Sequence, residues 1–140
     1  MTEVTILDGG MSRELQRLGA RLRQPEWSAL ALIESPDIVR NAHTAFIDAG
    51  ADVVTTNSYA LVPFHIGEER FRREGAELIA LSGRLAREAA EAAGRRILVA
   101  GSLPPIFGSY EPELFRQDDV QDYLLSLIHI SEPTRQAEIS

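Results

Sequence analysis

The residues best suited to chemistry stand in a turn near the start of the chain, where Asp8, Gly9 and Gly10 follow the apolar run 4–7. A carboxylate accepts hydrogen bonds from an ammonium group. Glycine has no side chain to cover the backbone amides, and it can adopt a positive φ. We interpret this turn as a cradle for a small ligand, with Asp8 as an acceptor at its rim. The same residues also suit a strand-to-helix turn that needs glycine only for its shape.

Two later apolar runs also end in polar residues. The run 52–57 ends in Thr56 and Asn57, and the run 97–102 ends in a glycine and Ser102. Their β-branched and aliphatic composition predicts strands. Because the carboxyl ends of parallel strands meet at one edge of a sheet, we expect these polar residues to lie near the first turn. Ser102 is either a wall of the same pocket or a helix cap.

Helical patterns separate the three predicted strands. Helix formers and apolar stripes predict helices over 13–18, 36–49 and 68–93, with Ser12 and Ser35 as their N-caps. The segment 20–34 is irregular, with one or two helical turns, and we expect it to cover the ligand-binding end of the sheet. Residues 58–67 are expected to form a loop.

The alternation of strands and helices favours an α/β fold with a parallel sheet, either doubly wound or closed as a (β/α)8 barrel. A dinucleotide-binding doubly wound sheet needs a Gly-x-Gly-x-x-Gly turn after its first strand, and the sequence has none. We therefore predict a (β/α)8 TIM barrel. Residues 1–124 would form only its first three or so βα units, because three strands cannot close a barrel.

Composition excludes several classes of protein. The chain has 140 residues and a formal net charge of -7, which argues against binding to nucleic acid. It has no cysteine, so it contains neither a disulfide nor a thiolate metal site. No stretch is long and apolar enough for a membrane span, and the start of the chain does not look like a signal peptide. We expect a cytoplasmic protein without a membrane partner.

Four motifs in order resemble the homocysteine S-methyltransferase family, over about residues 4–115. They are Leu7-Asp8-Gly9-Gly10-Met11-Ser12-Arg13-Glu14-Leu15, Trp27-Ser28-Ala29, Ala49-Gly50-Ala51-Asp52 with Thr55-Thr56-Asn57-Ser58-Tyr59, and Val99-Ala100-Gly101-Ser102-Leu103-Pro104-Pro105. The resemblance implies a (β/α)8 barrel that uses zinc to bind homocysteine as a thiolate. The thiolate takes a methyl group from a sulfonium, betaine or folate donor, and methionine is the product.

The resemblance also implies roles for individual residues. Asp8 and the amides of Gly9 and Gly10 would bind the amino-acid end of homocysteine. Thr56 and Asn57 would line the barrel mouth beside the sulfur. Tyr59 falls where some family members place an aromatic ring against a cationic methyl donor. Tyr59 is equally well explained as an amphipathic residue packed on the rim.

The family's zinc ligands are cysteines, in Gly-x-Asn-Cys and Gly-Gly-Cys-Cys segments, and this chain lacks them. His43, on a predicted helix away from the strand ends, is expected to be half-buried packing. His65 is expected in a loop, with no second ligand at a suitable spacing. We therefore expect zinc in the full-length enzyme only. Within these residues we assign neither a metal ligand nor a catalytic residue, and we expect the fragment to be inactive alone.

The last sixteen residues, 125–140, resemble a translated sequencing adapter, and we interpret them as a non-native tail that replaces the true continuation. Two other functions stay open. A lyase or aldolase on the same barrel could use a Schiff base, although the chain contains no lysine. A non-enzymatic α/β binding module could instead use the exposed edges of its sheet. The methyl donor and the oligomeric state cannot be deduced from the sequence.

Overall fold

The computed structural model describes residues 4–107, 110–117 and 120–121, so the predicted tail lies outside the described part. Its elements, in chain order, are α1 (Met11–Arg17), α2 (Ser28–Glu34), α3 (Pro36–Asp48), β1 (Val53–Thr55), α4 (Pro63–Ile66), α5 (Glu68–Ala92), β2 (Leu98–Ala100) and the 3-10 turn η1 (Pro112–Leu114). Within the described ranges, no helix combines the length and the hydropathy needed to cross a membrane.

The sheet is small and parallel, as predicted. β1 and β2 pair with Val54 opposite Val99, and Leu7 forms an isolated parallel bridge with Val53 on the other side of β1. The prediction of a full strand over 4–7 is therefore wrong. The amide of Ile6 donates to a carboxylate oxygen of Asp52 at 2.9 Å rather than to a main-chain carbonyl, and this interrupts the regular ladder.

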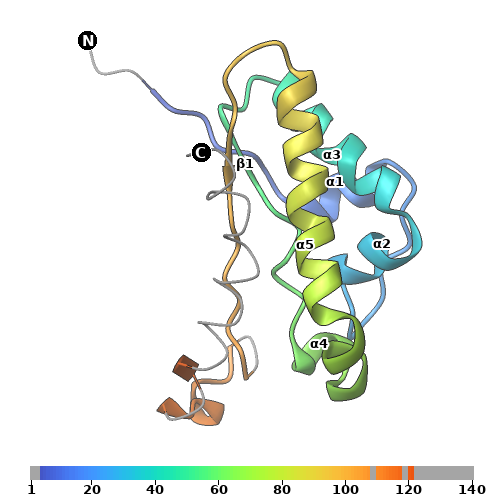
Figure 1. Ribbon diagram of the computed structural model, residues 1–140, viewed down its shortest axis with the longest axis vertical. Helices are drawn as coiled ribbons and strands as arrows, with labels where there is room; N and C mark the ends of the chain where they lie inside the picture. Colours follow the sequence, from blue (N-terminus) through green and yellow to red (C-terminus); the bar gives the residue numbers. More distant parts are fainter. Residues whose placement is uncertain (1–3, 108–109, 118–119, 122–140) are drawn as a thin grey trace, which may run out of the picture.

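The helices lie on one side of the sheet. Figure 1 shows the strands beside the long α5, with α1, α2 and α3 beyond it. α3 and α5 pack together, and both contact β1. A large apolar cluster fills the space between the helices, and a smaller one lies between α3, α5 and β1. The smaller cluster consists of Ile47, Val54, Ala86 and Ala89.

The other side of the sheet is apolar but open. Leu7 and Leu98 lie opposite Val53 on the two neighbouring segments, so they share one face of the sheet, and both are exposed. Parallel strands are normally buried on both faces, and in a barrel the second face packs against the side chains of other strands. The helix-covered and open faces together are those of a partial barrel.

Helix boundaries depart from the sequence predictions in three places. α1 begins at Met11, so Ser12 lies inside its first turn and is not the N-cap. Ser35 does stand at the N-cap of α3, but its side chain makes no capping hydrogen bond. The predicted loop 58–67 contains α4, which Pro63 starts and which buries His65. The other predicted bounds hold to within one or two residues.

Candidate functional site

Asp8 lies at the carboxyl end of the strands, where β1 holds its side chain. The amide of Thr55 donates to Asp8 Oδ2 at 2.7 Å, and the Thr55 hydroxyl donates to Oδ1 at 3.2 Å. Asp8 is half-buried, so its carboxylate is fixed without being sealed off. Each carboxylate oxygen has a second lone pair. Asp8 can therefore accept further hydrogen bonds from a ligand.

The two glycines after Asp8 differ in how closely their surroundings pack. Neither takes the positive φ that we expected, and Gly10 has φ -70°. A Cβ on Gly9 would lie 3.0 Å from the Phe46 ring, so glycine is needed there for close packing on α3. A Cβ on Gly10 would meet nothing closer than Arg13 Cγ at 3.9 Å. Both glycines are exposed, but neither has the predicted conformation.

A hollow of about 410 Å³ opens beside this turn. It is lined by Asp8–Arg13, Ser28, Thr55–Asn57, Tyr59 and Ser102. Among the described residues, the amides of Gly9 and Gly10 have no hydrogen-bond acceptor. The residues that carry these two donors line the hollow together with Asp8, an arrangement suited to a molecule with a carboxylate and an ammonium group.

Thr56 belongs to a closed ring of hydrogen bonds at the same edge. Its hydroxyl accepts from the Ser102 amide at 3.1 Å and lies 2.8 Å from Ser58 Oγ. The Ser58 hydroxyl donates to the Ser102 carbonyl at 3.0 Å, so its one hydrogen is already used. Thr56 must then be the donor in its contact with Ser58. The ring ties the end of β1 to the end of β2 and positions Thr56 in the wall of the hollow.

Asn57 also lies in that wall, but it is only 4% exposed. Its side-chain amide donates to the Ser28 carbonyl at 3.0 Å, across 29 residues of sequence. The structure thus brings Asp8, Gly9, Gly10, Thr56 and Asn57 to one hollow. Of these, Asn57 has its donor group engaged with the segment that leads into α2.

Tyr59 stands between this hollow and a second one of about 710 Å³. Ser12, Ser28 and Tyr59 line both, so the two hollows adjoin. The second hollow has an aromatic wall that the sequence analysis did not assign to a site. That wall contains Trp27, Phe64 and His65. The sequence did contain a signal for this hollow, since aromatic residues occur in both irregular segments, the one before α2 and the one after β1.

His43 and His65 are both buried. His43, on α3, is fully buried rather than half-buried, and neither ring nitrogen has a hydrogen-bond partner in the described part of the chain. Burial lowers the pKa of His43 to about 4, while the charge of Asp8 acts to raise it. His43 lies on α3, as predicted. His65 lies on α4, not in a loop.

The described residues do not fit a metal site. No group of three or more His, Cys, Asp or Glu side chains is placed to hold an ion within 4–107, 110–117 and 120–121. The sequence has no cysteine to add to such a group. No step of the chemistry is therefore assigned to a metal held by these residues.

Helices packed on a parallel sheet, with polar groups gathered at the carboxyl ends of its strands, are the construction of (β/α)8-barrel enzymes. The chain belongs to the homocysteine S-methyltransferase family, whose family model matches residues 5–130. This range includes the first residues of the predicted tail. The fold is the first part of such a barrel, as predicted.

Individual relatives agree with this assignment. The chain is 39% identical over 85 residues to homocysteine S-methyltransferase 1 from Zea mays, covering 60% of this chain and 26% of that protein. It is 36% identical over 116 residues to homocysteine S-methyltransferase from Escherichia coli, covering 77% of this chain and 37% of that protein. The crystal structure of the metallated form of the homocysteine methyltransferase MmuM from Escherichia coli superposes on this chain with a TM-score of 0.74 at 29% identity. The superposition covers 92% of this chain and 50% of that chain. The chain thus spans about a quarter to a half of these relatives.

Proposed function

We propose that this chain supplies the substrate-binding start of an enzyme that methylates the sulfur of homocysteine to give methionine. The observation that carries this proposal is the pair of adjoining hollows at the carboxyl ends of the strands. One has groups for an amino-acid head, and the other has an aromatic wall. Methyl transfer needs two small substrates side by side, with the thiolate sulfur in line with the methyl carbon.

The first hollow is the proposed site of homocysteine. Its ammonium group would donate to Asp8, and its carboxylate would accept from the amides of Gly9 and Gly10. Thr56 and Asn57 would then flank the side chain that carries the sulfur. The support for this orientation is the way Thr55 fixes the Asp8 carboxylate while leaving lone pairs for a ligand.

The second hollow is the proposed site of the methyl donor. A sulfonium or betaine donor is a cation, and aromatic ring faces attract cations. Tyr59, 43% exposed, lines this hollow with Trp27 and Phe64. When the thiolate attacks, the new carbon–sulfur bond forms while the donor atom keeps the electron pair of the broken bond and loses its positive charge. The aromatic wall favours a cationic donor over a folate.

Zinc remains our proposal for the complete enzyme, with ligands outside the described residues. One relative has been solved in a metallated form, which supports a metal in this family. A cytoplasmic location likewise remains a prediction, as does the absence of a nucleic-acid partner.

A chimera tests the proposed function. Residues 5–107 of this chain would replace the matching segment of the Escherichia coli methyltransferase, and methionine formation from homocysteine would be followed with S-methylmethionine or glycine betaine as donor. We expect methyl transfer from at least one of these cations. A chimera that has native-like circular dichroism and binds zinc, but forms no methionine, would overturn the proposal.

A further inference from the structure

The segment 24–28, which we call the cover segment, holds an unusual backbone. Trp27 has φ 47° and ψ -126°, although it is not glycine. Such a conformation costs about 1–3 kcal/mol and persists only when surrounding contacts enforce it. The indole is 45% exposed and lines the second hollow. Something must therefore hold the main chain on both sides of Trp27.

Two buried side chains provide those contacts. His65 Nδ1 lies 2.8 Å from the carbonyl oxygen of Pro25, and Asn57 Nδ2 donates to the carbonyl of Ser28 at 3.0 Å. The donors are 7% and 4% exposed, and the accepting carbonyls lie before and after Trp27. Both donors come from the stretch that follows β1. The cover segment is thus held at two points, by α4 and by the turn after β1.

The chemistry of the His65 contact fixes its tautomer. A carbonyl oxygen can only accept, so the hydrogen must sit on Nδ1 of His65. The same ring meets Phe64 edge to face, with centroids 5.0 Å apart, and its centroid is 6.5 Å from that of Tyr59. One imidazole therefore joins the cover segment to two aromatic residues of the same hollow.

We propose that His65 and Asn57 are positioning residues, which clamp the cover segment so that Trp27 stays in the wall of the second hollow. They do this through hydrogen bonds to the Pro25 and Ser28 carbonyls, a role separate from the part that the same two residues take in lining the hollows. That the wall serves a cationic methyl donor rests on the proposed function. The clamp itself rests on the two hydrogen bonds and on the backbone of Trp27.

Fluorescence provides a direct test, because Trp27 is the only tryptophan in the chain. In the 140-residue protein, His65→Leu removes the Nδ1 donor, whereas His65→Asn places an amide donor at nearly the same position. We expect His65→Leu to shift Trp27 emission to longer wavelength and to raise its acrylamide quenching constant about twofold. His65→Asn should behave like the parent chain.

Ser82→Ala is the matched control. It removes a side-chain hydrogen bond to a carbonyl, 2.7 Å to Ile79, from an equally buried position on α5. Unchanged Trp27 emission in His65→Leu, or an equal shift in Ser82→Ala, would overturn the clamp. If His65→Leu loses its far-ultraviolet circular dichroism, His65→Asn decides: parent-like emission supports the clamp and shifted emission refutes it.

The chimera separates this inference from the proposed function. There we expect His65→Leu to raise the KM for the cationic donor about tenfold, with the KM for homocysteine unchanged and recovery in His65→Asn. A parent chimera without methyl transfer would count against the proposed function only, because the fluorescence result needs no substrate. An equal rise in both KM values would refute a role specific to the second hollow.

Discussion

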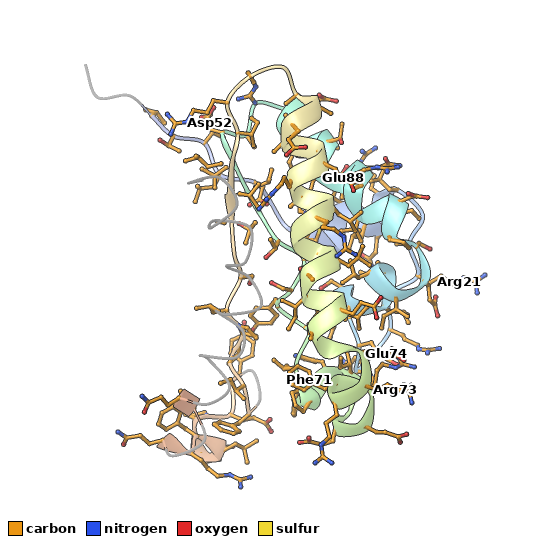
Figure 2. The ribbon with its side chains drawn as sticks, in the orientation of Figure 1. Arg21, Asp52, Phe71, Arg73, Glu74 and Glu88 are labelled. Carbon is orange, nitrogen blue, oxygen red and sulfur yellow. The ribbon has the colours of Figure 1, made fainter. Side chains whose placement is uncertain are left out.

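The two ends of the small sheet use their polar groups differently. At the amino end, Arg95 donates to the carbonyls of Ile47 and Ala51 at 2.9 and 2.8 Å, and to Asp52 at 3.1 Å. The other oxygen of Asp52 accepts from the amide of Ile6. Figure 2 shows Asp52 at this end, where the chain enters the strands. Its carboxylate and the Arg95 guanidinium are thus both used to hold the fold.

At the carboxyl end, some polar groups are fixed but not fully used. Asp8 is held by Thr55 and keeps lone pairs, while Gly9 and Gly10, whose amides have no acceptor among the described residues, line a hollow. This contrast is the general division of (β/α) folds, with stability at one end of the strands and ligand binding at the other. Substitutions at the carboxyl end should therefore affect binding more than stability, and substitutions at the amino end the reverse.

The largest expected effect is that of Asp8→Asn. The amide oxygen can still accept from the Thr55 amide, and the new NH₂ can donate to the Thr55 hydroxyl, so the fold should be kept. The ammonium group of homocysteine would lose its charged partner, at a cost of about 4 kcal/mol. We expect kcat/KM for homocysteine in the chimera to fall roughly a thousandfold.

The fall in kcat/KM should come with a change in the midpoint of urea unfolding no larger than that of a surface substitution. If Asp8→Asn instead lowers stability and leaves kcat/KM for homocysteine unchanged, Asp8 serves to hold the fold and not to bind the substrate. The contrast between the two ends would then be wrong.

The next largest effect is a pH dependence of stability that comes from His43, which is buried on α3. Burial lowers the pKa of His43 from 6.5 to about 4. Between these values the unfolded chain binds a proton at His43 that the folded chain does not. The contribution of His43 to stability is therefore constant above pH 6.5 and is lost as the pH drops through this window. The full loss is about 3 kcal/mol. Urea unfolding at pH 7 and pH 4.5 should show a smaller loss in His43→Leu than in the parent, and equal losses would contradict the prediction.

At the amino end, Arg95→Leu should lower the free energy of unfolding by about 2 kcal/mol. It removes charge-assisted hydrogen bonds to two carbonyls and to Asp52, and it leaves that carboxylate without its cation. Arg96→Leu is the matched control, because Arg96 is exposed and makes no hydrogen bond or ion pair with the described residues. Urea denaturation measures both. An equal loss of unfolding free energy in the two variants would show that the loss of a positive charge, and not the loss of the Arg95 hydrogen bonds, causes the destabilisation.

The sequence allowed us to predict which polar residues gather at the carboxyl ends of the strands, because each motif is a short run of neighbouring residues. An apolar run followed by Asp8-Gly9-Gly10, or by Thr56-Asn57, is visible in a few neighbouring residues, and parallel strand order brings such turns together. The same reasoning predicted the bounds of α3 and α5 to within one residue, because the sequence marks where both helices start and end. It gave the wrong reason for Gly9, because the ring of Phe46 approaches only in the folded chain.

Contacts between distant parts of the chain could not be predicted. The donors Asn57 and His65 reach carbonyls 29 and 40 residues away, and Arg95 reaches Ile47 across 48. A carbonyl has no sequence signature, so nothing in the residue types marks Pro25 as an acceptor. The burial of His43 depends likewise on how α3 packs. The second hollow was missed for the same reason.

The smallest predicted effects distinguish the two glycines at the carboxyl end. Gly9→Ala would bring a Cβ to 3.0 Å from the Phe46 ring, which must move, and we expect a loss of about 1 kcal/mol in urea unfolding. Gly10→Ala has open space and a φ of -70°, so its stability should change by a few tenths of a kcal/mol. In Gly9→Ala, a second substitution, Phe46→Leu, should recover part of the loss, because it removes the atoms that the new methyl group meets. Equal destabilisation by the two alanines would show that the turn needs glycine at both positions for its backbone and not for close packing against α3.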